Sequence, residues 1–318
     1  PDSGSISSSD CIDASPGHYV ADNSWTEEID TGFDVTISAG DRHTCMLLDN
    51  QSVVCTGFGG YGQLGNGGTD DLSEPDFIDA TAHGWFTSVV SGEGFSCAVV
   101  FDGPLCWGKN DEGQLGDGSN TDRDSPVPVS GFTGSAETSP VELDAGGSHA
   151  CGIRVEGSTY CWGSNQYGQL GNGETSNSNS ITQVSGFGSG REAVDLALGG
   201  SHSCAILDNG SVSCWGYNGY GQLGVGDTSD RITPTVVAGL SNVVELVTAS
   251  GGWHSFARRN DGTWLAWGRN DFGQLGLGDT VSRWRPQKVA ALAGKPVRIA
   301  SAVRALTPPP WPKSITVS

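Results

Sequence analysis

The sequence predicts an all-β protein, a β-propeller of four-stranded blades, and three observations carry this prediction. First, the tetrapeptide Gly-Gln-Leu-Gly occurs five times at intervals of 51, 55, 53 and 52 residues, with its glutamine at Gln63, Gln114, Gln169, Gln222 and Gln274. Second, 49 glycines and a charged fraction of only 16% suit many short strands and turns rather than helices. Third, eight cysteines form four pairs whose members lie nine or ten residues apart. A period of this length is typical of propellers and other repeat architectures.

Each copy of the repeat contains the same elements in the same order. A strand rich in Val and Leu comes first, and a Gly-rich corner ending in His follows it. Next come a hairpin, the dipeptide Trp-Gly, the Gly-Gln-Leu-Gly corner, and a variable loop that leads to a last strand. The hairpins are marked by turn residues that tolerate positive φ, at Asp102-Gly103, Glu156-Gly157, Asn209-Gly210 and Asp261-Gly262, with Asn50-Gln51 as the irregular member. Each repeat therefore supplies the four short strands of one blade.

The cysteine pairs support this register. Each pair straddles one hairpin turn, so its members face each other on adjacent antiparallel strands: Cys45 and Cys55, Cys97 and Cys106, Cys151 and Cys161, Cys204 and Cys214. In the fifth copy both cysteines are absent together, replaced by Phe256 and Ala266, which indicates that they pair. Zinc is the competing interpretation, but no Cys-x-x-Cys spacing occurs and two sulfurs per blade cannot complete a four-ligand site. We predict four disulfides, no metal, and an oxidising, extracellular location.

The number of blades depends on the two ends of the chain. Residues 34–296 contain the five clear repeats of about 52 residues. The N-terminal segment 1–33 and the C-terminal segment 297–318 together have about the length of one more repeat, and residues 297–301 resemble an opening strand. We therefore expect six blades, with N- and C-terminal strands closing the ring, and seven as the alternative. The C-terminal segment is then a partial repeat followed by a Pro-rich tail, and Cys11 is left without a partner.

Three motifs of the frame resemble the regulator of chromosome condensation repeat family, in a secreted, disulfide-containing form. They are Gly-Gly-x-His-x-Cys, Cys-Trp-Gly-x-Asn and Gly-Gln-Leu-Gly, as in residues 199–204, 214–218 and 221–224. The resemblance covers residues 34 to 296. It implies a propeller, usually seven-bladed, whose blades present loops to protein partners.

Recurring polar and aromatic residues are expected to maintain the frame. His43, His149, His202 and His254 occupy one equivalent position, and we expect each ring to bond backbone carbonyls within its own blade. Four tryptophans are expected to pack between blades: Trp107, Trp162, Trp215 and Trp267. The Gly-x-Gly-x-x-Gly matches are followed by a loop and not by the helix that a dinucleotide site needs, so they indicate tight corners.

Residues that differ between copies are not needed by the frame and are free to serve recognition. The candidate binding residues are the corner residues Arg42, Glu93 and Trp253 and the residues that follow Trp-Gly, Lys109, Tyr217 and Arg269. A solvated surface without a ligand is the alternative interpretation. Trp85, Trp264 and Trp284 also differ between copies.

Charge and motif content exclude several functions. The net charge of -20 disfavours binding to nucleic acid, and no apolar run reaches the roughly 20 residues of a membrane span. Neither a nucleophile elbow nor a zinc-protease motif is found, so we expect no enzyme and no cofactor. The sequence predicts a non-enzymatic secreted scaffold that recognises a protein partner through variable loops on one propeller face. A glycan-binding propeller is the alternative.

Overall fold

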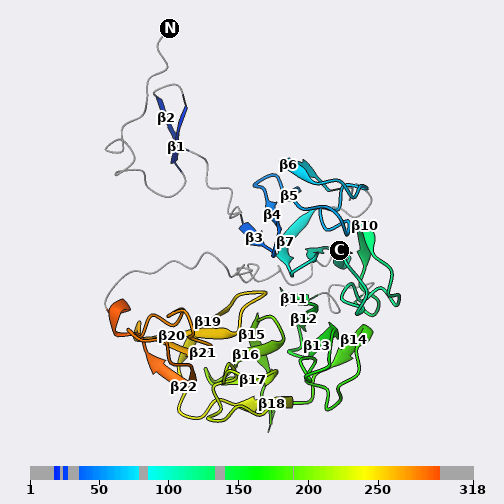
Figure 1. The fold of residues 1–318 in the computed structure, drawn as a ribbon. Coiled ribbons are helices and arrows are strands. Elements are labelled where there is room, and N and C mark those ends of the chain that lie inside the picture. The colour runs from blue at the N-terminus through cyan, green and yellow to red at the C-terminus, as the bar shows by residue number, and fades with distance from the viewer. Residues whose placement is uncertain are drawn as a thin grey trace, which may run out of the picture.

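A computed structural model describes residues 18–21, 24–27, 36–78, 85–132, 140–188 and 190–293 of the chain, with the first two ranges and Val141 given by backbone alone. It contains five four-stranded antiparallel sheets, each formed by four consecutive strands (Figure 1). Blade 1 has β3 (Thr36–Ala39), β4 (His43–Leu47), β5 (Val53–Gly57) and β6 (Leu72–Phe77); blade 2 has β7 (Phe86–Ser91), β8 (Phe95–Val100), β9 (Gly103–Gly108) and β10 (Arg123–Pro128); blade 3 has β11 (Pro140–Ala145), β12 (His149–Arg154), β13 (Thr159–Gly163) and β14 (Ser178–Gln183); blade 4 has β15 (Ala193–Leu198), β16 (His202–Leu207), β17 (Val212–Gly216) and β18 (Arg231–Val236); blade 5 has β19 (Val243–Thr248), β20 (His254–Arg259), β21 (Trp264–Gly268) and β22 (Arg283–Lys288).

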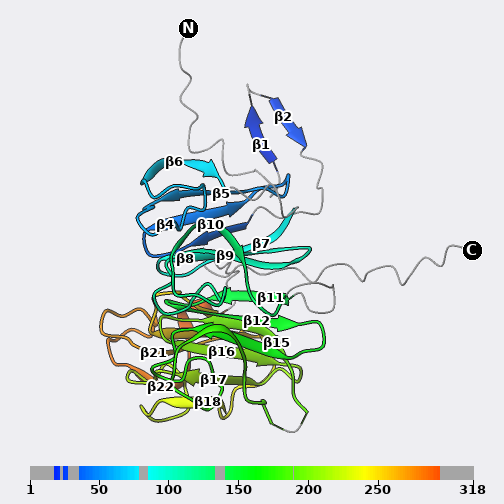
Figure 2. The same ribbon diagram turned by 90° about the vertical axis from the view of Figure 1, so that its right-hand side faces the viewer.

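The all-β propeller architecture is confirmed, but the expected count of six blades is wrong for the described residues, which contain five. The N-terminal strands β1 (His18–Ala21) and β2 (Ser24–Glu27) form a two-stranded sheet of their own and add no strand to a blade (Figure 2). The expected C-terminal strand, the Pro-rich tail and Cys11 lie outside the described residues. Apart from strands, the described residues contain one short 3₁₀ helix, Ala290–Leu292, and no helix that is long and apolar enough to cross a membrane.

The blades follow one another around a common axis (Figure 1). The first strand of each blade is the innermost, and residues from β3, β7, β11, β15 and β19 together line a cavity on the axis. The turns between second and third strands form as the sequence predicts, since Gly103, Gly157, Gly210 and Gly262 all have positive φ. The irregular turn of blade 1 uses Gln51 at φ 64° instead. Blades 1 and 5 are the first and last of the five described blades around this axis.

The four predicted disulfides are all present, each joining the second and third strands of its blade. In each case the two cysteines are directly opposite in the antiparallel register, and their side chains are fully buried. Phe256 and Ala266 occupy the same opposed positions in blade 5. The joint loss of both cysteines in the fifth copy therefore reflects the loss of one cross-strand bond.

Replacing Cys151 and Cys161 together by alanine is expected to lower the free energy of unfolding by about 2–3 kcal/mol, because the crosslink limits the unfolded chain. Guanidinium denaturation without reductant measures the change. The same crosslinks predict that iodoacetamide adds at most one carbamidomethyl group, on Cys11, to unreduced native protein. Alkylation of several cysteines, or an unchanged denaturation midpoint in the double variant, would contradict the pairing.

The hydrophobic cores lie between neighbouring blades. Separate buried clusters join blades 1 and 2, blades 2 and 3, blades 3 and 4, and blades 4 and 5. As expected, each tryptophan of the Trp-Gly dipeptides packs between blades: its indole nitrogen donates to the carbonyl of the Gly-Gln-Leu-Gly glutamine in the preceding blade, as Trp215 does to Gln169 at 2.8 Å. The same contact is made by Trp107, Trp162 and Trp267. One tryptophan in each of blades 2 to 5 thus joins its blade to the one before it.

The histidines correct one expectation, because their rings bond the next blade rather than their own. His149 Nε2 lies 2.8 Å from the Ser203 hydroxyl, and His43 and His202 make the same contact to Ser96 and Ser255. Ser203 in turn donates its proton to the Gln169 carbonyl at 2.9 Å, so the ring must donate from Nε2 to the serine oxygen. Sequence reasoning missed the partner because it lies 54 residues away in the chain.

Candidate functional site

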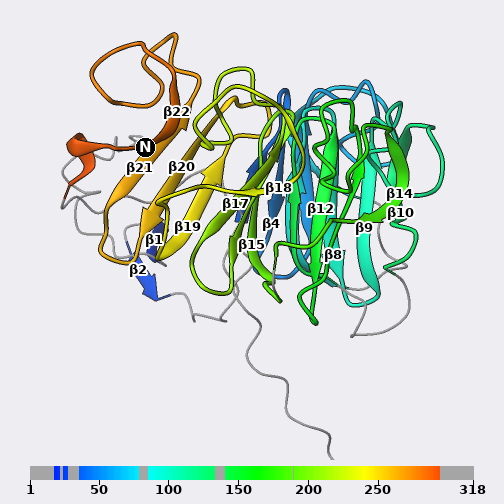
Figure 3. The same ribbon diagram turned by 90° about the horizontal axis from the view of Figure 1, so that it is seen from below.

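Two sets of loops meet on one face of the propeller, which we call the loop face (Figure 3). One set is the corners between first and second strands, and the other is the long loops between third and fourth strands. Backbone hydrogen bonds join the two sets within a blade, since the residue after Trp-Gly donates its N–H to a corner carbonyl. Tyr217 donates to Ser201 at 2.9 Å, and Arg269 donates to Trp253 at 2.8 Å. The two classes of candidate binding residue therefore lie side by side.

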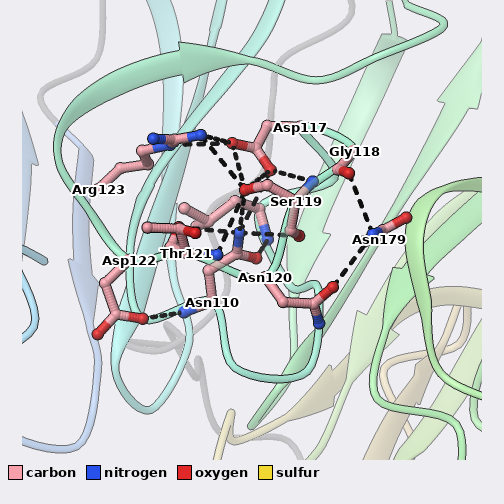
Figure 4. Close-up of polar contacts among 10 residues, drawn as sticks. Asn110, Asp117, Gly118, Ser119, Asn120, Thr121, Asp122, Arg123 and Asn179 are labelled. Atoms are coloured by element: carbon pink, nitrogen blue, oxygen red, sulfur yellow. Dashed lines mark hydrogen bonds and ion pairs between the residues drawn. The ribbon is translucent and has the colours of Figure 1, made fainter.

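A buried asparagine fixes each long loop in blades 2 to 5. In blade 2, Asn110 donates from Nδ2 to the Ser119 and Thr121 carbonyls and accepts from the Leu115 N–H at 3.0 Å (Figure 4). Asp117 in the same loop pairs with Arg123 at 2.8 Å. Asn165, Asn218 and Asn270 make equivalent bonds in their own blades. These loops are consequently held in one conformation by buried polar groups.

The glutamine of Gly-Gln-Leu-Gly positions a surface side chain. Its Oε1 accepts the backbone N–H of the residue two positions earlier, as Gln222 does from Tyr220 at 3.0 Å. The same bond fixes the residue two positions before the glutamine in the other four blades, namely Tyr61, Glu112, Tyr167 and Phe272. Four of the five blades therefore present an aromatic ring from this position on the loop face.

Blades 3, 4 and 5 bring three of these aromatic side chains together with three of the candidate binding residues. We call the six residues the aromatic–arginine patch: Tyr167, Tyr217, Tyr220, Trp253, Arg269 and Phe272. The ring of Tyr217 lies at its centre, 4.8 Å from Tyr167 and 5.1 Å from Trp253 between centroids. The Trp253 contact is edge to face, an arrangement that the ring quadrupoles favour. Burial and then the neighbouring Tyr220 raise the pKa of Tyr217 above its usual value, so its hydroxyl stays protonated at neutral pH.

Arg269 extends the patch outward through cation–π contacts. Its guanidinium lies 4.9 Å from the Tyr220 ring centre and 5.7 Å from that of Phe272. Asp271 holds the other side of the guanidinium at 2.8 Å. The Phe272 ring is 84% exposed, so the rim of the patch offers an apolar surface to solvent.

Blade 5 contributes Trp253 to the patch from the last residue of its corner, which is longer than the other corners. The corner has three residues in blades 1 to 4 and five residues, 249–253, in blade 5. The Gly200 N–H donates to the Gly252 carbonyl at 3.0 Å, which ties the longer corner to blade 4. The Trp253 carbonyl accepts from Arg269 as the Ser201 carbonyl accepts from Tyr217, so Trp253 holds the corner position of Ser201 and its long side chain brings the indole to Tyr217.

A smaller group, the basic–aromatic cluster, lies on blades 1 and 2. Arg42 stands over the Phe58 ring at 5.6 Å, and Lys109 over the Tyr61 ring at 5.7 Å. Phe58 and Tyr61 pack edge to face at 5.6 Å, so the four side chains are continuous. Asp111 pairs with Lys109 at 3.0 Å. This cluster contains two of the candidate binding residues but no tryptophan.

Glu93 is separate from both groups and lies over the axis. A Cβ placed on Gly147 of blade 3 would come within 3.0 Å of its Oε1, and one on Gly251 of blade 5 within 3.3 Å. Burial and then the nearby Asp41 raise the pKa of Glu93, while Lys109 lowers it. The glycines of blades 3 and 5 therefore leave room for a carboxylate above the axial opening.

The axial cavity has a volume of about 580 Å³ and an acidic lining. Asp144 accepts backbone N–H bonds from Ala145 at 2.8 Å and from Leu198 of the next blade at 2.7 Å. Burial nevertheless raises the pKa of Asp144 to about 7. In the described part of the chain, no three His, Cys, Asp or Glu side chains are grouped as a metal site requires. Asp144 therefore joins blade 3 to blade 4 through its bond from the Leu198 N–H.

The structure brings together Tyr217, Trp253 and Arg269 of the six predicted residues, and separately Arg42 and Lys109. Their role in binding stays a prediction. Sequence reasoning missed Tyr167, Tyr220 and Phe272 because it looked for residues that differ between copies, whereas an aromatic residue before Gly-Gln recurs in four copies. That recurrence was the available signal, since equivalent positions of a propeller lie on one face.

The remaining copy-specific tryptophans lie elsewhere. Trp264 is buried within blade 5. Trp284 packs on Gly221 of blade 4, where a Cβ would meet its ring at 2.4 Å. Trp85 is 75% exposed and stands beside Phe86, whose N–H bonds the hairpin residue Gln51 on the opposite face.

Comparison with known proteins places these features in a family. The ultraviolet-B receptor UVR8 of Arabidopsis thaliana is 32% identical over 259 residues, which are 81% of this chain and 58% of UVR8. The human E3 ubiquitin-protein ligase HERC2 is 29% identical over 268 residues, 83% of this chain and 6% of HERC2. The chain thus spans less than two thirds of the length of these relatives.

Solved structures agree on the fold. Human WBSCR16 superposes with a TM-score of 0.71 at 21% identity, over 82% of this chain and 67% of that chain. Prp20p from Saccharomyces cerevisiae superposes with a TM-score of 0.71 at 18% identity, over 81% of this chain and 64% of that chain. The model of the RCC1-like domain family matches residues 34–306. With this match over most of its length, the chain belongs to the RCC1-like domain family.

Proposed function

We propose that this protein is a non-enzymatic binding scaffold whose aromatic–arginine patch recognises a protein partner. The observation that carries the proposal is the meeting of five aromatic rings and one arginine, from three blades, on the loop face. Tyr, Trp and Arg dominate the binding energy of protein interfaces. The glutamine and asparagine bonds beneath the patch hold it rigid before binding, which limits the entropy lost on association.

The relatives support a protein as the partner. One solved structure of Prp20p is described together with that protein's binding to Gsp1p and histones. UVR8 is named as a receptor. HERC2 is named as a ligase, but this chain corresponds to only 6% of it. The described binding of Prp20p to proteins, together with the patch, supports a protein as the partner of this chain.

An oxidising compartment is part of the proposal. Four buried disulfides within 318 residues are typical of secreted proteins and rare in reducing cytosol. The net charge of -20 disfavours nucleic acid as the ligand. We propose an extracellular location, which intact-mass analysis of protein from its native source tests through the oxidation state of the eight paired cysteines.

Replacing Trp253 and Arg269 together by alanine is expected to weaken partner binding by at least about 30-fold, the effect of removing one interface hot spot. The partner is first captured by crosslinking to wild-type protein and identified by mass spectrometry, and its affinity is then measured by titration calorimetry. Trp85→Ala is the matched control, because it removes an exposed tryptophan from the opposite face. We expect it to bind as wild type does.

The same variants separate protein from glycan recognition. Exposed tyrosine and tryptophan rings also stack on sugars, so a glycan array is probed with wild-type protein and with both variants. Sugar binding that needs Trp253, together with no protein partner, would replace our proposal with the lectin alternative. Equal affinity of the double variant and wild type for the captured partner would remove the patch from the binding site.

A further inference from the structure

The wall of the axial cavity carries more negative than positive charge. Four carboxylates line the cavity, those of Asp41, Asp144, Asp195 and Glu245, and its lining includes no described lysine, arginine or histidine. Two of the four have arginine partners outside the lining, Arg258 for Glu245 and Arg42 for Asp41. Asp144 instead accepts two backbone N–H groups and forms no ion pair with a described residue. The cavity therefore suits a positively charged ligand.

The carboxylates of the cavity also repel one another, and a cation would relieve this repulsion. Burial and then the charge of Asp195 raise the pKa of Asp144 to about 7. Glu93 adds another carboxylate above the opening, close to Gly251 of the lining. A pocket lined by one sign of charge concentrates ions of the opposite sign.

A buried hydroxyl on the same wall has no partner. Thr248, the last residue of β19, lines the cavity and is only 8% exposed. Its Oγ1 forms no hydrogen bond with a described residue. Buried hydroxyl groups are normally hydrogen-bonded, so this one indicates a partner that enters the cavity.

The other blades show which bond is missing at this hydroxyl. Ser91 holds the equivalent place in blade 2, and it donates its hydroxyl to the Ser38 carbonyl of blade 1 at 3.3 Å and its N–H to the Ser38 hydroxyl at 2.8 Å. The Leu198 N–H of blade 4 donates in the same way to Asp144 of blade 3. Ala197 holds the position of Ser38 and Asp144 in blade 4, opposite the second-strand cysteine, and its side chain offers no acceptor to blade 5.

We infer that the axial cavity binds an alkylammonium ion. The Thr248 hydroxyl accepts one of its N–H groups, and the carboxylates of the wall balance its charge. Val90, Leu196 and Leu246 give the same cavity an apolar surface on which methylene groups pack. A metal ion fits less well, because within the described ranges no three acidic, histidine or cysteine side chains are grouped as a metal requires.

Two sources share this ligand chemistry, a free diamine and the lysine side chain of another chain. Both have an ammonium group on a short run of methylene groups. The cavity and the aromatic–arginine patch have no residue in common, so binding here is independent of the proposed function.

The test titrates the full chain with 1,5-diaminopentane by calorimetry, at about pH 7.5 and about 0.15 M salt to screen weak surface attraction. We expect one ligand per chain with a dissociation constant below about 1 mM. Thr248→Val keeps the volume and every charge of the cavity but removes the hydroxyl, so binding should weaken at least about tenfold. This variant should be no less stable than wild type to guanidinium, because the hydroxyl that it loses has no partner.

Thr159→Val is the matched control. Thr159 is also buried with an unpartnered Oγ1 among the described residues, but it lies on β13 and does not line the cavity. We expect this variant to bind the diamine as wild type does. It shows whether loss of any buried hydroxyl affects binding.

Nα-acetyl-lysine methylamide, titrated in parallel, separates the two sources. Tighter binding of the lysine compound assigns the cavity to a lysine side chain, and tighter binding of 1,5-diaminopentane assigns it to a free amine. The net charge of -20 attracts any cation weakly, and Thr248→Val leaves that charge unchanged. Equal affinity of Thr248→Val and wild type for both compounds, or no saturable binding of either by wild type, would therefore overturn the inference.

Discussion

Asn218→Ala is expected to lower the free energy of unfolding by about 3–4 kcal/mol, a large effect for one side chain on the loop face. Asn218 is fully buried. Its Nδ2 donates to the Asp227 and Ser229 carbonyls, each at 3.0 Å, and its Oδ1 accepts from the Leu223 N–H at 3.0 Å. Alanine removes these bonds and leaves the buried Leu223 amide unpaired.

Asn209→Ala is the matched control in the same blade. Asn209 is exposed at the hairpin tip and accepts from the Ser211 N–H and hydroxyl. Water replaces those bonds, so we expect a loss below about 1 kcal/mol. Guanidinium denaturation of both variants measures the difference. Equal effects would show that the buried network does not stabilise the long loop.

The Asn218 variant also connects the frame to the proposed binding site. Asn218 follows Tyr217 directly and fixes the loop that carries Tyr220. A loop that loses its anchor samples more conformations, so partner affinity should fall even where the protein stays folded. Asn209→Ala should bind as wild type does, because its turn lies on the opposite face.

The structure of a single blade could be predicted from the sequence, because glycine turns, paired cysteines and Trp-Gly are local signals that fit one structure. The register of Cys151 opposite Cys161 follows directly from the hairpin length. The partner of His149 did not follow, because a serine in the next copy becomes its neighbour only when the blades assemble. A signal existed in the sequence: Ser96, Ser203 and Ser255 each come one residue after the histidine position.

Blade number and the binding patch are harder for a physical reason. The number of blades is set by the small rotation between neighbours and by residues at both ends, and no motif encodes it. The patch forms because rings from three blades converge, with Trp253 of blade 5 against Tyr217 and Tyr220 of blade 4. Copy-to-copy differences identified Tyr217, Trp253 and Arg269, whereas Tyr167 and Tyr220 required knowledge of which face a repeated position occupies.

Acid is expected to unfold this protein steeply, because three buried histidines are held neutral between blades. Burial lowers the pKa of His43 to about 4 and that of His149 and His202 to about 3. Unfolding returns each ring to its usual pKa of about 6.5, so the unfolded chain takes up three more protons between those values. The stabilisation is present above pH 6.5 and is lost as pH falls.

Asp144 opposes this effect in part. Its pKa is raised to about 7 in the folded protein, so the folded chain binds up to one more proton than the unfolded chain between about pH 4 and 7. The net uptake on unfolding is therefore about two protons. The free energy of unfolding should fall by roughly 2–3 kcal/mol per pH unit between pH 6 and pH 4. Urea denaturation followed by tryptophan fluorescence at several pH values measures this slope.

The chain itself contains the variant that isolates one histidine. Phe95 stands in place of histidine in blade 2, and Ala150 stands in place of serine in blade 3, within one buried cluster. His149→Phe combined with Ser203→Ala copies this interface, and the Gln169 carbonyl keeps its bond from Trp215. We expect stability at pH 8 within about 1 kcal/mol of wild type and a slope smaller by the uptake of one proton, roughly 1 kcal/mol per pH unit.

Ser203→Ala alone distinguishes charge from packing. It leaves the buried Nε2 donor of His149 without an acceptor, which costs about 1–3 kcal/mol at every pH, but the ring still titrates. The slope should therefore stay at the wild-type value while the whole curve shifts down. If the double variant kept the full slope of the free energy of unfolding against pH, His149 would not be a source of acid sensitivity. Its ring would then have to be protonated already in the folded protein. Its Nδ1, which is buried without a hydrogen-bond partner among the described residues and 2.6 Å from a Cβ placed on Gly146, leaves no room for the acceptor that such a proton requires.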